Sequence, residues 1–243
     1  MSSDLELALR LADTADAISL RHFRSGLAIE TKADLTPVTE ADRAVEADLR
    51  RILADERPDD AVLGEEQGTV GAGRRRWILD PIDGTRSYVR GIPTWATLVA
   101  LDEADVVRIG VVSAPALGRR WWAERGAGAF VDGEQMTVST VARIEDAVLC
   151  LPLDPRLTTI AARAWHGRGL GDFWGHMLVA EGAADGTVDG APGLAEWDLA
   201  AVQVIVEEAG GRFSDFAGHA RIDSGSAVTS NGLLHDELLA ALT

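Results

Sequence analysis

The sequence predicts a layered protein of mixed helices and strands, of the α/β or α+β class. Segments with helical period alternate along the chain with short apolar runs typical of strands. The chain has 243 residues, 47% of them hydrophobic, which is enough to bury a sizeable core in one large domain or two smaller ones. We find no internal repeat, low-complexity tract or linker.

The first two predicted helices begin at capping residues. Ser3 and Glu6 form a capping box, and Gly26 is expected to end the helix that follows. Thr39 or Asp42 is expected to cap the second helix. The apolar residues expected to face the core are Ala8, Leu11, Ala15 and Ile18 in the first helix and Val45, Leu49, Ile52 and Leu53 in the second.

The remaining elements follow from the period of the apolar residues. Strands are predicted at residues 28–32, 98–101, 106–112, 120–123, 130–131, 136–138, 147–151, 187–188, 212–214 and 227–229. Helices are predicted at residues 157–164, 174–180, 199–209 and 233–242. Asp132 and Gly133 form a turn, and residues 67–76, rich in Gly and Arg, are expected to be a mobile loop.

Residues 77–85, with the sequence WILDPIDGT, combine features of a metal site and a phosphate site. The apolar beginning predicts a short buried strand that ends at two carboxylates, Asp80 and Asp83. Pro81 between them excludes a helix, so a backbone turn is expected there. Two hard oxygen ligands suit Mg²⁺, and Gly84 followed by a helix start suits a phosphate. The alternative for an isolated D-x-x-D is an acidic turn that caps a helix.

Two further acidic segments follow the same logic. Gly64-Glu65-Glu66 comes directly after an apolar run, and Glu196-Trp197-Asp198 opens a helical pattern that ends at Ala209-Gly210-Gly211. GEE, WILDPIDGT and WD in this order resemble the motif set of the inositol monophosphatase superfamily over nearly the whole chain. Within it, three segments look most like bacterial histidinol-phosphate phosphatases of this type: residues 90–96, 119–122 and 171–176.

The resemblance implies a five-layer αβαβα sandwich that binds two or three Mg²⁺ ions per active site. Residues 1–151 would form the metal- and phosphate-binding half, and residues 152–243 would complete the metal site and bind the leaving group. Two ions about 3.5–4 Å apart can hold both the attacking water and the leaving oxygen. Asp80 would bridge them; an isolated Asp198 would instead be read as a helix N-cap. The implied ligands are Glu65, Asp80, the carbonyl of Ile82, Asp83 and Asp198.

The resemblance also assigns the groups that act on water and on phosphate. Asp42 would hold the hydroxyl of Thr85, and Thr85 with Glu65 would orient the attacking water. Backbone N–H groups of Gly84 and Thr85 would hold the phosphate, and Lys32 would assist as a point charge. The alternatives are helix capping for Asp42 and an exposed strand lysine for Lys32.

Acidic and aromatic residues of the second half suit the ammonium and imidazole groups of histidinol phosphate. Asp172 and Asp189 are predicted to bind these groups, with Glu196 beside the metal site and Trp174 packing on the ring. Asp189 falls where inositol phosphatases of the family tend to hold a glutamate that contacts the leaving group. The alternatives are a helix N-cap for Asp172, a turn for Asp189 and the core for Trp174.

The predicted function is Mg²⁺-dependent hydrolysis of L-histidinol phosphate by attack of an activated water, in histidine biosynthesis. Inositol-1-phosphate hydrolysis or a broader small-molecule phosphatase activity is the alternative within this class. An acidic domain that binds divalent ions and a partner is the alternative outside it. The complete set of acidic motifs argues against this non-enzymatic role.

Composition limits the partners of the protein. With 39 acidic and 23 basic residues, the formal net charge is -16, and no basic stripe is present, so nucleic-acid binding is not expected. No signal-like segment or run of ~18 apolar residues is present, so we expect a cytoplasmic protein without membrane contact. Cys150 is the single cysteine and is expected to be buried on a strand. The family resemblance implies a homodimer.

Overall fold

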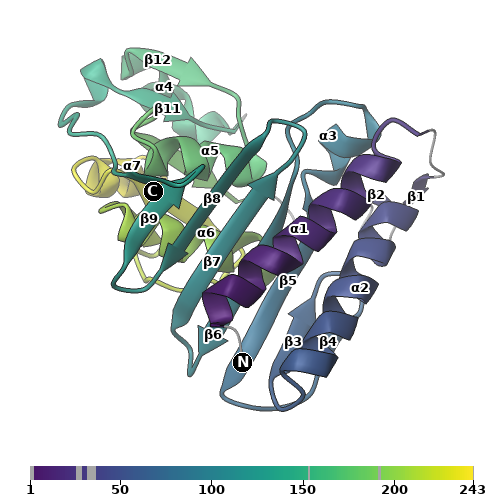
Figure 1. Ribbon diagram of the computed structural model, residues 1–243. Helices are drawn as coiled ribbons and strands as arrows, with labels where there is room; N and C mark the ends of the chain where they lie inside the picture. Colours follow the sequence, from purple (N-terminus) through teal and green to yellow (C-terminus); the bar gives the residue numbers. More distant parts are fainter. Residues whose placement is uncertain (1–2, 26–28, 32–36, 153, 191–192, 243) are drawn as a thin grey trace.

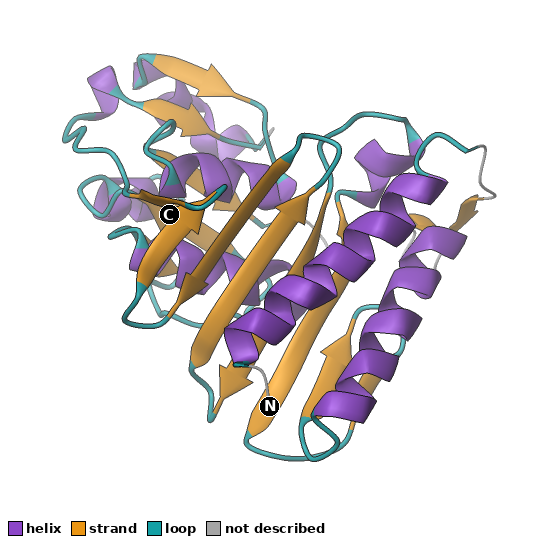
Figure 2. Ribbon diagram, viewed as in Figure 1, coloured by secondary structure: helices purple, strands orange, loops and turns teal. Residues whose placement is uncertain are grey.

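The computed structural model describes residues 3–25, 29–31, 37–152, 154–190 and 193–242. Within them the α-helices are α1 Asp4–His22, α2 Glu40–Glu56, α3 Thr85–Val89, α4 Thr158–Arg163, α5 Asp172–Ala180, α6 Glu196–Glu208 and α7 His235–Ala240. Two short 3₁₀ helices are η1 Ile144–Asp146 and η2 Pro155–Leu157. Figure 1 and Figure 2 show how these helices lie around two β-sheets.

Eight strands of the described chain form the larger sheet: β3 Ala61–Gly64, β4 Gly68–Val70, β5 Arg75–Asp83, β6 Ala96–Glu103, β7 Val107–Ala114, β8 Arg119–Glu124, β9 Gly128–Val131 and β10 Glu134–Met136. Their order across the sheet is β10-β9-β8-β7-β6-β5-β3-β4. β3 and β5 run parallel, and the other neighbours are antiparallel. Side chains alternate between the two faces, so Trp77 and Leu79 pack against α1 and α2, whereas Ile78 packs with residues of α6.

Five strands in the described residues form the smaller sheet: β11 Val148–Cys150, β12 His166–Arg168, β13 Gly186–Asp189, β14 Arg212–Ser214 and β15 Ala227–Ser230. Their order is β12-β11-β13-β15-β14, and β11 is parallel to both neighbours. The two strands of a separate ribbon are β1 Ile29–Thr31 and β2 Pro37–Thr39. The smaller sheet takes its first strand, β11, from before residue 151, and Cys150 on it is buried, as predicted.

The sheets and helices alternate in five layers across the described part of the molecule. α1 and α2 cover one face of the larger sheet, and α5 and α6 lie between the two sheets. α4 and α7 pack on the outer face of the smaller sheet. The αβαβα sandwich expected from the family resemblance is therefore confirmed.

Most element boundaries differ from the sequence prediction by one to three residues, and three differences have a structural cause or change an assignment. α1 ends at His22 because the backbone of Phe23 is extended, and Gly26 lies outside the described residues. The segment predicted as a mobile loop, residues 67–76, contains β4 and the start of β5. β10 begins earlier than predicted because Asp132 and Gly133 both have positive φ, the geometry of a two-residue hairpin turn.

Both predicted capping groups at the amino ends of α1 and α2 are present. The Ser3 hydroxyl accepts a hydrogen bond from the Glu6 N–H at 3.1 Å, and the Ser3 N–H donates to the Glu6 carboxylate at 2.9 Å. The Thr39 hydroxyl accepts from the N–H of Ala41 at 3.1 Å, and Asp42 accepts from the N–H of Thr39 at 2.8 Å. Thr39 is therefore the cap, and Asp42 completes it.

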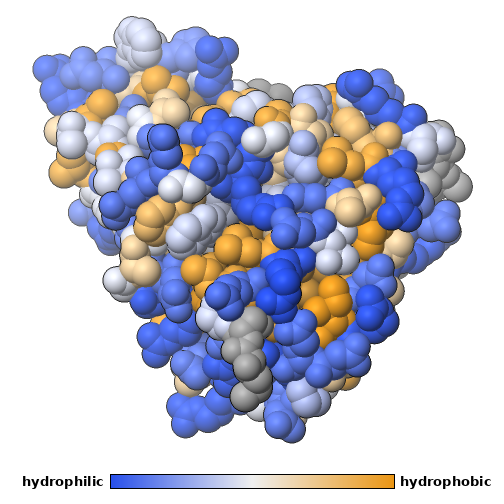
Figure 3. Space-filling model, viewed as in Figure 1, coloured by the Kyte–Doolittle hydropathy of each residue, from blue (hydrophilic) through white to orange (hydrophobic). Residues whose placement is uncertain are grey.

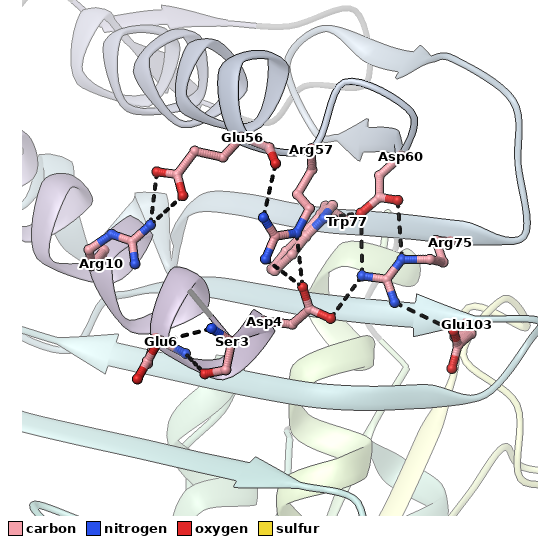
Figure 4. A network of polar contacts seen from close by, with 10 residues as sticks. All are labelled: Ser3, Asp4, Glu6, Arg10, Glu56, Arg57, Asp60, Arg75, Trp77 and Glu103. Carbon is pink, nitrogen blue, oxygen red and sulfur yellow. Dashed lines mark hydrogen bonds and ion pairs between the residues drawn. The ribbon is translucent and has the colours of Figure 1, made fainter. Parts of the chain in front are cut away.

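A network of charged side chains ties the start of α1 to the end of α2 and to β5 (Figure 4). Asp4 lies 2.8 Å from both Arg57 and Arg75. Asp60 accepts hydrogen bonds from Arg75 at 3.1 Å and from the indole of Trp77 at 3.0 Å. Burial alone would raise the pKa of Asp4, but hydrogen bonds from Arg75 and Arg57 outweigh it, so its pKa lies below the usual value.

The face seen in Figure 3 is mainly hydrophilic, with apolar patches separated by polar side chains. In the described part of the chain, no helix is both long and apolar enough to cross a membrane.

A buried histidine joins α7 to the smaller sheet. The two ring nitrogens of His235 lie 2.8 Å from the Ser214 hydroxyl and 3.0 Å from the Ser230 hydroxyl. Burial lowers the pKa of His235 to about 4. Because the pKa of an unfolded histidine is about 6.5, the unfolded state binds more protons between these values. The stability that neutral His235 contributes is therefore present above pH ~6.5 and is lost as the pH falls towards ~4.

We expect the free energy of unfolding to fall more steeply between pH 7 and pH 5 in the wild type than in His235→Gln. The two decreases in unfolding free energy should differ by on the order of 2 kcal/mol over this range, since glutamine keeps polar contacts but takes up no proton. Urea unfolding in chelator at both pH values measures it. Equal slopes would show that His235 is not the group that takes up the proton.

Candidate metal and phosphate site

Three carboxylates from two distant segments meet at the end of β5. Asp80 and Asp83 come from β5, and Asp198 comes from the first turn of α6. One carboxylate oxygen of each lies within 4.8 Å of the others. Asp80 and Asp83 are only 1% and 8% exposed. The structure thus brings together three of the predicted metal ligands, although Asp198 is more than a hundred residues away in the sequence.

An irregularity in β5 turns both of its carboxylates to one side. Asp80 pairs with Leu98 on β6, and Asp83 pairs with Ala96, so three steps along β5 match two steps along β6. The extra residue changes the alternation, and both carboxylates can therefore face α6. The predicted turn at Pro81 is instead a bulge within a strand, which Pro tolerates because it has no N–H to pair.

The electrostatics of this cluster fit a divalent cation. Burial, together with the charges of Glu65, Asp83 and Asp198, raises the pKa of Asp80 well above its usual value. The Oδ1 atom of Asp80 is buried and has no hydrogen-bond partner among the described residues. Hard carboxylate oxygens that repel each other, with one buried oxygen left without a hydrogen-bond donor in the described chain, are the donor set that a divalent metal takes. The acidic cluster can therefore hold a metal ion.

Glu65 approaches the cluster from the end of β3. Its N–H donates to the carbonyl of Leu79 at 3.3 Å, which joins it to β5. Its charge contributes to the raised pKa values of Asp80, Asp42 and Asp198. These effects place its carboxylate within electrostatic reach of the other acidic groups.

Glu46, which the sequence analysis missed, holds the loop that carries Glu65. The buried Glu46 carboxylate accepts hydrogen bonds from the N–H groups of Glu66 at 2.7 Å and Gln67 at 3.0 Å, and it pairs with Arg50 at 2.7 Å. A Cβ atom on Gly64 would lie 2.5 Å from this carboxylate, so a larger residue there would displace the Glu46 carboxylate. The sequence did contain a signal for this role: Glu46 lies on the inward face of α2, and Arg50 follows four residues later.

The Thr85 hydroxyl does not make the predicted hydrogen bond to Asp42. It donates instead to the carbonyl of Ile82 at 2.9 Å, because a hydroxyl has one proton and this carbonyl lies three residues back in the turn. Asp42 accepts a hydrogen bond from the Thr39 hydroxyl at 2.6 Å. Burial, together with the charge of Glu65, raises the pKa of Asp42 to about 6, and its Oδ1 atom has no partner in the described chain.

Gly84 brings the backbone to the start of α3 in a conformation that favours glycine. Its φ is +79°, and a Cβ atom there would lie 2.9 Å from the carbonyl oxygen of Thr94. The N–H groups of Gly84 and Thr85, predicted to hold phosphate, lie directly after Asp83. The remaining predicted phosphate ligand, Lys32, lies outside the described residues.

Asp172 connects the carboxylate cluster to α5. It is the first residue of α5, so Gly171, and not Asp172, occupies the N-cap position. The N–H of Phe173 donates to Asp83 at 2.6 Å, which places the start of α5 beside the cluster. Burial of the carboxyl group and the charge of Asp189 raise the pKa of Asp172, whereas exposed Arg86 lowers it. Arg86 is a cation at this site that the sequence analysis did not single out.

The other predicted substrate residues take different positions. Asp189 ends β13, 4.0 Å from the buried ring of His176. Trp174 is half-buried and packs against the core between the sheets, which agrees with its alternative role. Glu196 forms an ion pair with Arg76 at 2.7 Å. The predicted substrate contacts of these residues stay predictions.

Comparisons with known proteins agree with this arrangement. The chain matches the model of the inositol monophosphatase family over residues 1–243. It is 50% identical to a histidinol-phosphatase of Mycobacterium tuberculosis over 98% of this chain and 97% of the relative. A histidinol-phosphatase of Streptomyces coelicolor is 47% identical over 98% of this chain and 96% of that protein. The structure of an IMPase from Thermotoga maritima superposes with a TM-score of 0.90 at 32% identity, covering 98% and 96% of the two chains.

Proposed function

The chain belongs to the inositol monophosphatase family, and we propose that it hydrolyses L-histidinol phosphate to L-histidinol and inorganic phosphate in histidine biosynthesis. The observation that carries this proposal is the full-length similarity to two histidinol-phosphatases. Three carboxylates that could hold a metal ion, those of Asp80, Asp83 and Asp198, lie together and support the proposal. These residues support an enzymatic role over that of a binding domain.

We infer that the acidic cluster binds Mg²⁺, in two or three positions. Asp80, Asp83 and Asp198 would hold it together with Glu65 and the carbonyl of Ile82. When bound, Mg²⁺ stabilises the charge that develops on the phosphoryl group and makes water a better nucleophile at neutral pH.

The other residues of the site bind and orient the reactants. The N–H groups of Gly84 and Thr85 hold phosphate oxygens at the start of α3, and Glu65 with Thr85 orients the attacking water. The Thr85 hydroxyl is held by the carbonyl of Ile82, and Asp42 accepts from Thr39 at the start of α2. On the leaving-group side, Asp172 and Asp189 bind the cationic groups of histidinol. Such positioning is the larger part of what a protein contributes to phosphoryl transfer.

Activity is expected to depend on a divalent metal. Phosphate release from L-histidinol phosphate should require Mg²⁺ and fall to background in chelator, because the acidic site otherwise repels a phosphate dianion. Ca²⁺ should inhibit, since its longer bonds and looser geometry misplace the reactants. A phosphate-release assay with Mg²⁺, Ca²⁺ or chelator measures these effects. Full activity in chelator would contradict the proposed metal role.

Three further properties are proposed with this function. Residues 1–151 and 152–243 form the two functional halves, the protein is cytoplasmic, and it is a homodimer. Light scattering of the purified protein tests the homodimer directly.

A further inference from the structure

Arg76 connects the strand that carries Asp80 to the helix that carries Asp198. Its guanidinium lies 2.9 Å from Asp102 and 2.7 Å from Glu196. Arg76 and Asp102 face each other directly across β5 and β6, and Asp102 is only 4% exposed. The guanidinium is therefore anchored in the sheet before it reaches α6. With 27% of the Arg76 and Glu196 side chains exposed, this is a partly buried pair and not a loose surface contact.

The geometry of α6 places Glu196 and Asp198 on opposite sides of the helix. Residues two positions apart on an α-helix project about 200° apart. Glu196 reaches one way to Arg76, and Asp198 reaches the other way to Asp80, four residues further along β5. Contacts on opposite sides of the first turn fix both the rotation of α6 about its axis and its place along β5.

The other contacts of this turn do not fix α6 in the same way. Asp198 accepts a hydrogen bond from the N–H of Ala195 at 2.6 Å, but this bond lies within the same turn and orients the carboxylate only relative to α6. The middle of α6 meets the larger sheet through apolar side chains such as Leu199 and Val202, and its far end is held by Glu207, which pairs with Arg125 at 2.6 Å, and by Glu208. Apolar contacts are non-directional and permit small rotations.

We propose that Arg76 is a positioning residue of the metal site, which through Glu196 sets where Asp198 stands relative to Asp80 and Asp83. This inference rests on the proposed function to the extent that these carboxylates bind Mg²⁺. It gives Glu196 a role in docking α6. Partners that orient metal ligands in this way commonly account for 10–100-fold in metal affinity.

Arg76→Gln separates positioning from simple charge, because the two predict opposite signs. Arg76 is a cation close to an acidic cation site, so charge alone predicts that its removal strengthens Mg²⁺ binding. Loss of positioning predicts weaker binding. Calorimetric titration of the protein with Mg²⁺, without substrate, measures the dissociation constant.

We expect Arg76→Gln to raise the dissociation constant at least about tenfold and Arg76→Lys to restore most of the affinity. Arg125→Gln is the matched control, because Arg125 pairs with Glu207 near the other end of α6 at 2.6 Å and its side chain is also 27% exposed. This control should change the constant by less than about twofold, since distant charges are screened. Thermal unfolding in chelator verifies that each variant is folded.

If Arg76→Gln does not fold, Glu196→Gln and Asp223→Asn decide the question. Both remove a negative charge near Arg76, but only the first breaks the connection to α6. Glu196→Gln should weaken Mg²⁺ binding much more than Asp223→Asn, and equal effects would overturn the proposal.

A folded Arg76→Gln that binds Mg²⁺ as tightly as the wild type, or more tightly, would also overturn it and leave the phosphatase function intact. A wild-type protein that binds no Mg²⁺ would overturn the proposed metal site together with this inference.

Discussion

Asp80→Asn is expected to reduce phosphate release by about a thousandfold or more while the protein remains folded. Asp80 is the most deeply buried member of the cluster, and its Oδ1 atom has no hydrogen-bond partner in the described chain. Asparagine has the same shape but removes the charge that would bind Mg²⁺. The thousandfold reduction corresponds to a loss of about 4 kcal/mol of transition-state stabilisation, since each 1.4 kcal/mol changes the rate about tenfold.

The same substitution is expected to stabilise the metal-free protein. Burial and the charges of Glu65 and Asp83 raise the pKa of Asp80 in the folded state above its unfolded value. The folded state therefore binds the additional proton, and stability is lost as the pH rises from about 4 through the folded pKa. At neutral pH without metal, Asp80 destabilises the fold. Asp80→Asn should unfold at a higher temperature than the wild type in chelator, and Mg²⁺ should raise that temperature less.

Phosphate release and thermal unfolding, each with Mg²⁺ and with chelator, measure both effects. Asp105→Asn is a suitable control, because Asp105 is exposed in the turn between β6 and β7 and its positive φ suits asparagine. The control should leave both properties unchanged. Retention of a tenth or more of wild-type activity in Asp80→Asn would contradict the central role of this carboxylate.

The carboxylate cluster could be predicted from the sequence because its residues lie in short, recognisable segments. WILDPIDGT places two carboxylates and a glycine within nine residues, and the family resemblance supplies Asp198. The bulge in β5 could not be predicted in this way. A proline between two aspartates is compatible with a turn or with a bulge, and only pairing with β6 distinguishes them.

Long-range polar contacts were the least predictable part of the structure. Residues 67–76 are polar and were expected to be a loop. However, the arginines at the start of β5 form ion pairs with carboxylates on α1 and α6. Arg76 and Glu196 are 120 positions apart, and no periodic pattern in the sequence indicates that they pair. The Thr85 hydroxyl bonds to Ile82 and not to Asp42 because of how α2 is placed beside the turn, which residue spacing does not determine.

Substrate selection is expected to depend on two carboxylates beside the metal cluster. Asp172 begins α5 next to Asp83, and Asp189 is close enough to raise the pKa of Asp172. Two neighbouring carboxylates repel each other and favour a cation between them. L-histidinol phosphate carries a primary ammonium and an imidazole, whereas inositol 1-phosphate offers neutral hydroxyls. A neutral leaving group offers no positive charge to these two carboxylates, which costs affinity in the transition state.

We expect kcat/KM for L-histidinol phosphate to exceed that for inositol 1-phosphate by more than about a hundredfold. Sites that hydrogen-bond or pair a polar group of the substrate discriminate at least this strongly against an analogue that lacks it. Asp172→Asn and Asp189→Asn should each reduce this ratio sharply while hydrolysis of an aryl phosphate is largely retained. Asp146→Asn, at an exposed position, is the control for a lost negative charge and should keep the ratio. Steady-state kinetics with the three substrates provide the measurement.

A ratio near one, or one that favours inositol 1-phosphate, would refute L-histidinol phosphate as the substrate and leave a metal-dependent phosphomonoesterase of broader specificity. A high ratio that survives both substitutions would instead place the recognition of the cation on other residues.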